Sequence, residues 1–116
     1  MFVYSVRCDF TESARDTVDQ WLSWMCSTHI QEVLESGAAV AELIEIESDL
    51  PCFQVNYQFE SVHAFARYES EHAPRLRHDS LKRFPISKGI SYSRTLGEIR
   101  GRFPKKTEHK TVSRPN

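Results

Sequence analysis

The segment 52–60, CFQVNYQFE, alternates apolar and polar side chains. Its apolar residues fall on one side of an extended chain and its amides on the other: Phe53, Val55, Tyr57 and Phe59 against Gln54, Asn56 and Gln58. Successive residues of a strand point to opposite faces, so this pattern predicts a β-strand with one buried and one polar face. The remaining chain must therefore provide neighbouring strands and a layer that covers the apolar side.

Three further stretches are predicted to be strands. Residues 2–8 alternate, with Phe2, Tyr4, Val6 and Cys8 on one side, and 90–96 places Ile90, Tyr92, Arg94 and Leu96 on one side. Residues 38–47 are apolar on both sides in part, because Val40, Ile44 and Ile46 lie on one and Ala39, Ala41 and Leu43 on the other. A sheet with one face in water alternates more cleanly. This stretch therefore predicts that something covers its second face.

Helices are predicted between the strands. Thr11 is placed to cap a long helix that runs to about Ser36, where Gly37 ends it. Ser61 caps a second helix, and Pro74 opens a short third one. The order β-α-β-β-α-(α)-β predicts an α+β fold of the ferredoxin-like type, a four-stranded antiparallel sheet with helices on one face. We expect this domain to span 1–98, and a basic polar tail to span 99–116.

The long helix carries a histidine inside its apolar stripe. At 100° per residue, one narrow sector holds Val18, Leu22, Met25, His29 and Val33, with Trp21 and Cys26 beside it and with Trp24, Ile30 and Leu34 outside it. A histidine there is either a neutral, buried imidazole with a hydrogen-bond partner, or a group on the floor of a cleft that contacts a ligand or acts as a base. Both interpretations stay open at this point.

Basic residues give a second set of candidates. The segment HAPRLRHDSLKRF carries Arg75, Arg77, Lys82 and Arg83 and is typical of a solvated helix face. Arg94 is different, because it lies on an otherwise apolar side of the last strand and needs a partner there. An acid such as Glu42 or an anionic ligand would serve.

Several blocks together resemble a known family. WLSWMCSTHIQEVLESG and HAPRLRHDSLKRF, with VYSV, FQVNYQFES and SYSRTL in the same order, look like the small bacterial proteins grouped as domain-of-unknown-function family 4286. The resemblance covers Phe2 to about Leu96 and implies a homodimer, sheet against sheet, of the dimeric α/β-barrel type. It implies no activity. Six positions are our ligand-binding candidates, and the third is also the catalytic candidate: Trp21, Met25, His29, His72, Arg75 and Arg94.

Composition limits the classes of function. No apolar run approaches the ~20 residues of a membrane span, and the N-terminus has no signal-peptide pattern. The three cysteines lack the spacing of metal ligands, so we expect a cytoplasmic protein without metal or cofactor. Residues 101–116 hold five basic residues and one acid, a charge of +4, which leaves −5 on the rest of a chain of net charge −1. An acidic body argues against nucleic acid as a partner.

Three functions remain. We place first a non-enzymatic module that binds a small ligand or a partner. The alternative is a cofactor-free enzyme, monooxygenase-like or isomerase-like, acting on a small organic substrate between helix and sheet. His29 would be its base, and Arg94 or Arg75 would hold an anion. The third function is contact with an anion or RNA through the basic helix and the tail.

Overall fold

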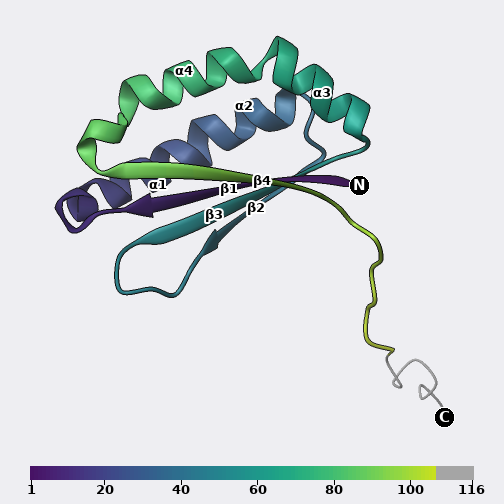
Figure 1. The fold of residues 1–116 in the computed structure, drawn as a ribbon, viewed down its shortest axis with the longest axis horizontal. Helices are drawn as coiled ribbons and strands as arrows, with labels where there is room; N and C mark the ends of the chain where they lie inside the picture. The colour runs from purple at the N-terminus through teal and green to yellow at the C-terminus, as the bar shows by residue number, and fades with distance from the viewer. Residues whose placement is uncertain (107–116) are drawn as a thin grey trace.

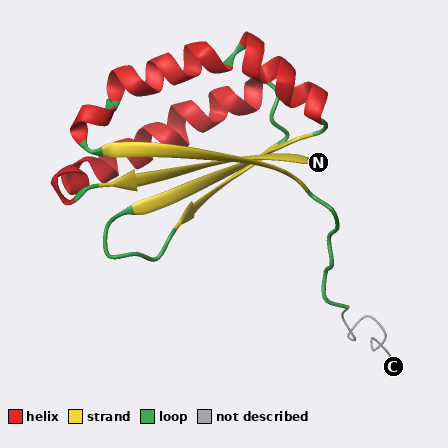
Figure 2. Ribbon diagram, in the orientation of Figure 1, coloured by secondary structure: helices red, strands yellow, loops and turns green. Residues whose placement is uncertain are grey.

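Four strands form one antiparallel sheet in the order β2-β3-β1-β4. They are β1 (Phe2–Phe10), β2 (Val40–Glu45), β3 (Cys52–Phe59) and β4 (Ile90–Glu98). The computed structural model describes residues 1–106, and all helices of this part lie on one face of the sheet (Figures 1 and 2). The ferredoxin-like prediction is confirmed. The 1–98 boundary of the domain stays a prediction, and part of the predicted tail, 107–116, lies outside the described residues.

The strand β3 provides the centre of the core. Its four predicted apolar residues are all buried: Phe53, Val55, Tyr57 and Phe59. In register, β1 places Tyr4 opposite Tyr57 and β4 places Leu96 opposite Tyr4. Arg94 pairs with Val6 in the same ladder and therefore lies on the face that the helices cover.

The long helical stretch is divided into four parts. A 3₁₀-helix (Glu12–Thr17) leads into α1 (Val18–Trp24), a π-helix (Met25–His29) follows, and α2 (Ile30–Glu35) ends the stretch. A π-turn holds about one residue more than an α-turn. The buried face therefore moves from Met25 to Ile30, five residues on, instead of to His29. The predicted stripe was wrong in part: Trp24 and Ile30 are buried, and Cys26 is exposed. The π-turn accounts for the burial of Ile30, whereas Trp24 precedes it.

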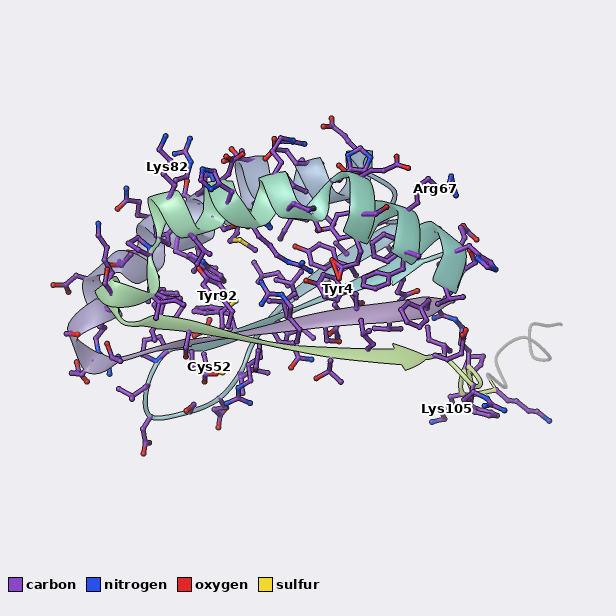
Figure 3. The ribbon with its side chains drawn as sticks, turned by 45° about the horizontal axis from the view of Figure 1, so that its top comes forward. Tyr4, Cys52, Arg67, Lys82, Tyr92 and Lys105 are labelled. Carbon is purple, nitrogen blue, oxygen red and sulfur yellow. The ribbon has the colours of Figure 1, made fainter. Side chains whose placement is uncertain are left out.

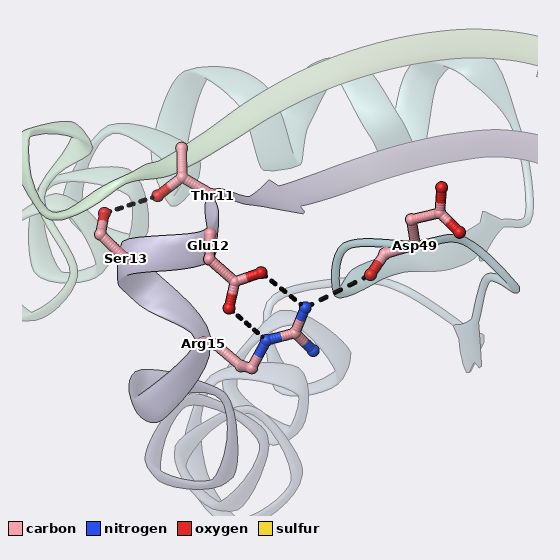
Figure 4. A network of polar contacts seen from close by, with 5 residues as sticks. All are labelled: Thr11, Glu12, Ser13, Arg15 and Asp49. Carbon is pink, nitrogen blue, oxygen red and sulfur yellow. Dashed lines mark hydrogen bonds and ion pairs between the residues drawn. The ribbon is translucent and has the colours of Figure 1, made fainter.

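The start of this stretch differs from the predicted cap. The Thr11 side chain accepts no hydrogen bond from a backbone N–H of the helix, and its Oγ1 lies 3.0 Å from Ser13 Oγ (Figure 4). Arg15 instead secures the first turn. Its Nε donates to Glu12 Oε2 at 2.7 Å, and its Nη2 reaches the Asp49 carbonyl oxygen at 3.3 Å in the loop before β3.

The end of the stretch agrees with the prediction. Gly37 has a φ of +133°, which favours glycine. Its N–H donates to the Leu34 carbonyl at 3.2 Å, and the Ala38 N–H donates to the Val33 carbonyl at 3.2 Å. This pair of bonds is a Schellman motif, and it satisfies two carbonyls that the helix leaves free.

Two consecutive helices complete the layer. The helix α3 (Val62–Glu71) is capped by Ser61, whose Oγ accepts from the Ala64 N–H at 3.1 Å, as predicted. The backbone then breaks at His72, and α4 (Ala73–Arg83) begins with Pro74 in its first turn. The face of α4 that points to the sheet buries Leu76 completely.

Within residues 1–106, the opposite face of the sheet carries no helix. Val40 and Ile44 on β2 are 43% and 38% exposed there. The central strands differ from β2, because Asn56 Oδ1 accepts hydrogen bonds from Ser5 Oγ at 2.8 Å and from Gln54 Nε2 at 3.0 Å. The open face is therefore polar in the middle, and β2 adds two exposed apolar side chains to it.

Candidate functional site

A cavity lies between the covered face of the sheet and the helices. Its walls come from β1, β3 and β4 below and from the long helical stretch, α3 and α4 above. Figure 3 shows Tyr4 and Tyr92 pointing into this layer, whereas Arg67 and Lys82 point outward. The space between the atoms is about 550 Å³ with the open mouth, but only about 50 Å³ is free for the centres of water-sized molecules. Only a small molecule fits unless side chains move.

The wall of the cavity is aromatic and aliphatic with a few polar groups. Both tryptophans of the chain line it, with three tyrosines from the sheet and one from α3. Two arginines, Arg77 and Arg94, contribute positive charge, and no aspartate or glutamate is among the lining residues. Such a wall combines apolar contact area with a few polar groups that fix orientation, as ligand sites do.

His29 lies in the wall at the end of the π-helix. Its imidazole stacks on the Trp24 indole, with ring centroids 4.9 Å apart, and its Nδ1 is buried without a hydrogen-bond partner among residues 1–106. Burial lowers the pKa of His29 from 6.5 to about 4; Asp79 opposes this shift and Arg94 adds to it. The imidazole is therefore neutral at pH 7.

Tyr4 connects the two arginines at one side of the cavity. Its hydroxyl oxygen accepts hydrogen bonds from Arg77 Nη2 at 3.1 Å and from Arg94 Nε at 2.9 Å. Arg77 also forms an ion pair with Glu69 of α3. Arg94 has no ion-pair partner in the described part of the chain.

Five buried side-chain polar atoms lack a hydrogen-bond partner within residues 1–106, and all five belong to residues that line this cavity. They are Trp21 Nε1, Trp24 Nε1, His29 Nδ1, Arg77 Nε and Tyr92 Oη. Buried polar groups are nearly always paired, with protein or with bound molecules. Their gathering at one place distinguishes this cavity from the rest of residues 1–106.

Two other groups in the wall are held protonated. Burial raises the pKa of the Cys8 thiol to about 12 and that of the Tyr92 hydroxyl to about 12. The Trp21 indole lies near the Tyr92 hydroxyl and opposes the second shift, although the two groups do not meet hydrogen-bond geometry. A thiol that stays protonated is a poor nucleophile.

The structure brings together four of the six predicted residues. Trp21, Met25, His29 and Arg94 all line the cavity. His72 and Arg75 do not. His72 lies at the break between α3 and α4, and Arg75 pairs on the surface with Glu32 at 3.6 Å and Asp79 at 3.9 Å.

Arg94 does not pair with Glu42, one of the two partners considered above. Glu42 is opposite Asn56 in the sheet and lies on the open face, whereas Arg94 lies on the covered face. Its hydrogen-bond partner is the hydroxyl oxygen of Tyr4.

Sequence reasoning missed further polar groups in the wall, among them those of Tyr4, Arg77 and Tyr92. The alternation of the first and last strands places Tyr4 and Tyr92 inward, so a signal existed for both. Arg77 directly follows the buried Leu76 and was assigned to a solvated face. Nothing in a basic helix distinguishes the one arginine that turns inward.

Two other properties of the described residues bear on function. No cluster of three His, Cys, Asp or Glu side chains that could hold a metal ion occurs within 1–106. In the same part of the chain, none of the helices has the length and apolarity to cross a membrane.

Solved structures share this architecture at low sequence identity. SnoaB, described as a cofactor-independent oxygenase from Streptomyces nogalater, has 12% identity and a TM-score of 0.64, covering 90% of this chain and 97% of its own. HapK from Hahella chejuensis has 11% identity and a TM-score of 0.64, covering 92% and 100%. A dimeric ferredoxin-like protein from an uncultured marine organism has 10% identity and a TM-score of 0.62, covering 90% and 98%.

At such identity these likenesses show the fold alone. No curated protein matches the chain. A family model does match, over residues 1–99, which is most of the sequence. The chain belongs to the family described as Domain of unknown function (DUF4286).

Proposed function

We propose that the protein binds a small organic molecule in the cavity between its helices and its sheet. The observation that carries this proposal is the set of five unpartnered polar atoms, all in the wall of one cavity. Leaving a buried donor or acceptor unpaired costs about 1–3 kcal/mol. A ligand with a few polar atoms would recover part of that cost for several of the five groups together.

The shape and chemistry of the wall suggest a flat ligand. Indole and phenol rings surround a narrow space, and aromatic faces favour offset or edge contacts with planar rings. The polar atoms are few and fixed in position, as in sites that orient a mainly apolar molecule.

A cofactor-free enzyme is the second candidate function. It is supported by the similarity in fold to SnoaB, which is described as a cofactor-independent oxygenase. The base expected for it is His29. A pKa of about 4 makes this imidazole a weak base at pH 7, because efficient general bases have a pKa near the working pH. We therefore place binding before catalysis.

Contact with an anion or RNA through the basic helix has less support. Arg75 pairs with Glu32 and Asp79, and Arg77 turns into the cavity and pairs with Glu69. Two of the arginines on which this third function depends are therefore already paired with acidic side chains of the same chain.

We also propose that the protein works as a homodimer that covers the open face of the sheet. The exposed Val40 and Ile44 support this, as does the description of a structural neighbour as dimeric. A cytoplasmic location is supported by the three cysteines, which are all free.

Tryptophan fluorescence tests the binding proposal directly, because both tryptophans of the chain line the cavity. The probes are benzoate, benzamide, phenylacetate and 2-phenylacetamide. We expect at least one of them to change the emission in a saturable way and to raise the melting temperature. Ser80 lines the cavity without being part of the buried core. The variant Ser80→Phe is expected to weaken that binding at least tenfold.

Ser70→Phe, at an exposed site of α3, is the matched control and should bind like the natural chain. If no probe changes the emission or the melting temperature, or if Ser80→Phe binds as well as Ser70→Phe, the cavity is not the binding site.

A further inference from the structure

Three segments that are far apart in the sequence meet at the hydroxyl oxygen of Tyr4. Arg77 comes from α4, Arg94 from β4 and Tyr4 from β1. The oxygen accepts from both arginines, at 3.1 Å and 2.9 Å. No acceptor for the O–H proton of Tyr4 itself occurs among residues 1–106. That proton is free to be donated to an oxygen atom of a ligand.

The charges at this point do not cancel. Two guanidinium groups share one phenol oxygen, and of the two only Arg77 has a carboxylate partner in the described chain, Glu69. Arg94 is without an ion pair in the described chain, and no lining residue is an acid. A guanidinium beside an apolar cavity is best satisfied by a planar anion, whose two oxygens match its fork of N–H groups.

The charge of Arg94 acts across the cavity. It works to lower the pKa of Cys8, His29, Tyr68 and Tyr92, four groups from three different elements and the π-helix. The potential is therefore positive near Arg94, whereas at His29 the opposite effect of Asp79 is larger. A positive potential in a low-dielectric space favours an anion over its neutral analogue.

We infer that the ligand of the cavity is a carboxylate on a flat apolar body, with its anionic group bound by Arg94 and Arg77 and by the hydroxyl of Tyr4. This inference rests on the proposed function and adds to it the class of ligand. Arg94 is exposed, so the carboxylate lies at the mouth, and the apolar body lies inside against the aromatic wall. Arg94 and Tyr4 bind and position the ligand; nothing in the inference requires a reaction.

The test compares an acid with its neutral isostere. Phenylacetate and 2-phenylacetamide have nearly the same shape and differ in charge. By tryptophan fluorescence at pH 7.5 and low salt, we expect the acid to bind at least tenfold more tightly to the natural chain. Arg94→Gln should bring the two dissociation constants to within about twofold, which is the loss of that preference, and should leave the amide unaffected.

The control is Arg67→Gln, which removes the same charge from an exposed site of α3 and should keep the preference. If the amide binds the natural chain as tightly as the acid, the inference is wrong while the cavity proposal stands. If neither binds, both are wrong. If the preference persists in a folded Arg94→Gln variant, the carboxylate is held elsewhere. The comparison in the natural chain decides the ligand class even if that variant does not fold.

Discussion

The imidazole of His29 is placed by packing, with its ring on the Trp24 indole and its Nδ1 unpaired within the described residues. The sequence left open two interpretations, a buried neutral imidazole and a group on the floor of a cleft, and each describes part of this environment. The group is largely buried and neutral, and it also lies in the wall of a cavity. A partner for its Nδ1 was expected from the rule that buried polar groups are paired. None occurs among residues 1–106.

His29 makes the stability depend on pH. The unfolded chain binds a proton on this side chain near pH 6.5, whereas the folded chain binds it only near pH 4. Between these values protons favour the unfolded state, so the free energy of unfolding should fall as the pH is lowered from 6.5 towards 4. The loss should approach about 3 kcal/mol, and it should be absent in His29→Gln.

Urea unfolding at pH 7.5 and pH 5 measures this difference. His78→Gln, at an exposed site of α4, is the control. Between pH 7.5 and pH 5 it should lose as much free energy of unfolding as the natural chain does. If His29→Gln and the natural chain lose the same free energy of unfolding between these pH values, the imidazole titrates normally in the folded protein.

The meeting of Tyr4 and Arg94 shows what sequence can and cannot supply at this scale. Alternation placed both side chains on the side of the sheet that the helices cover, and both are there. The distance between them depends on the register of β1 and β4, which sets Arg94 opposite Val6. Register is fixed by the packing of the whole sheet, so it could not be deduced from either strand alone.

The π-helix is the feature of secondary structure that the sequence did not reveal. A wheel drawn at 100° per residue assumes one period throughout, and one extra residue between Met25 and Ile30 shifts everything beyond it. The local sequence, MCSTH, has no proline or glycine to mark the change. Short π-segments are frequent at functional sites, and this one ends at His29 in the cavity wall.

Deleting one exposed residue should convert the π-turn into an ordinary turn. Without Ser27, Met25 and Ile30 are four apart, which places both on the buried face of a continuous α-helix. We expect the free energy of unfolding to stay within about 1 kcal/mol of the natural chain, because no buried side chain is lost. Urea unfolding monitored by circular dichroism measures it.

Deletion of Gln31, also exposed, is the matched control. It leaves Ile30 and Val33 two apart, so the helix cannot keep both in the core, and a loss of about 2–3 kcal/mol is expected. A Ser27 deletion as damaging as the Gln31 deletion would contradict this view of the π-turn.

At the scale of the whole molecule, the order of elements was sufficient for the architecture. The observed sheet and its layer of helices follow from the predicted order β-α-β-β-α-(α)-β, from one strict strand pattern and from two correctly placed end residues, Ser61 and Gly37. The open face was predictable in part. The amides of 52–60 were expected on this side, and Gln54 and Asn56 lie there with Ser5. The cover expected over 38–47 stays a prediction.

The proposed dimer can be tested by a substitution on the open face of the sheet. The natural chain is expected to have twice its 13.5 kDa mass at micromolar concentration in analytical ultracentrifugation. Ile44→Glu should raise the dissociation constant at least tenfold, because it places a charge on the apolar part of the open face. Ile86→Glu, 63% exposed after α4, should leave the mass unchanged. A natural chain that sediments as a monomer would rule out the dimer.

The oxygen of Tyr4 also connects parts of the molecule that could otherwise move independently. β4 is an edge strand, and α4 belongs to the layer above it. Each donates one side-chain hydrogen bond to the same oxygen of β1. Fraying of that edge near Arg94 would therefore remove one of the two hydrogen bonds at this oxygen, in the wall of the cavity. Movement of the edge strand and entry of a ligand into the cavity would then be coupled.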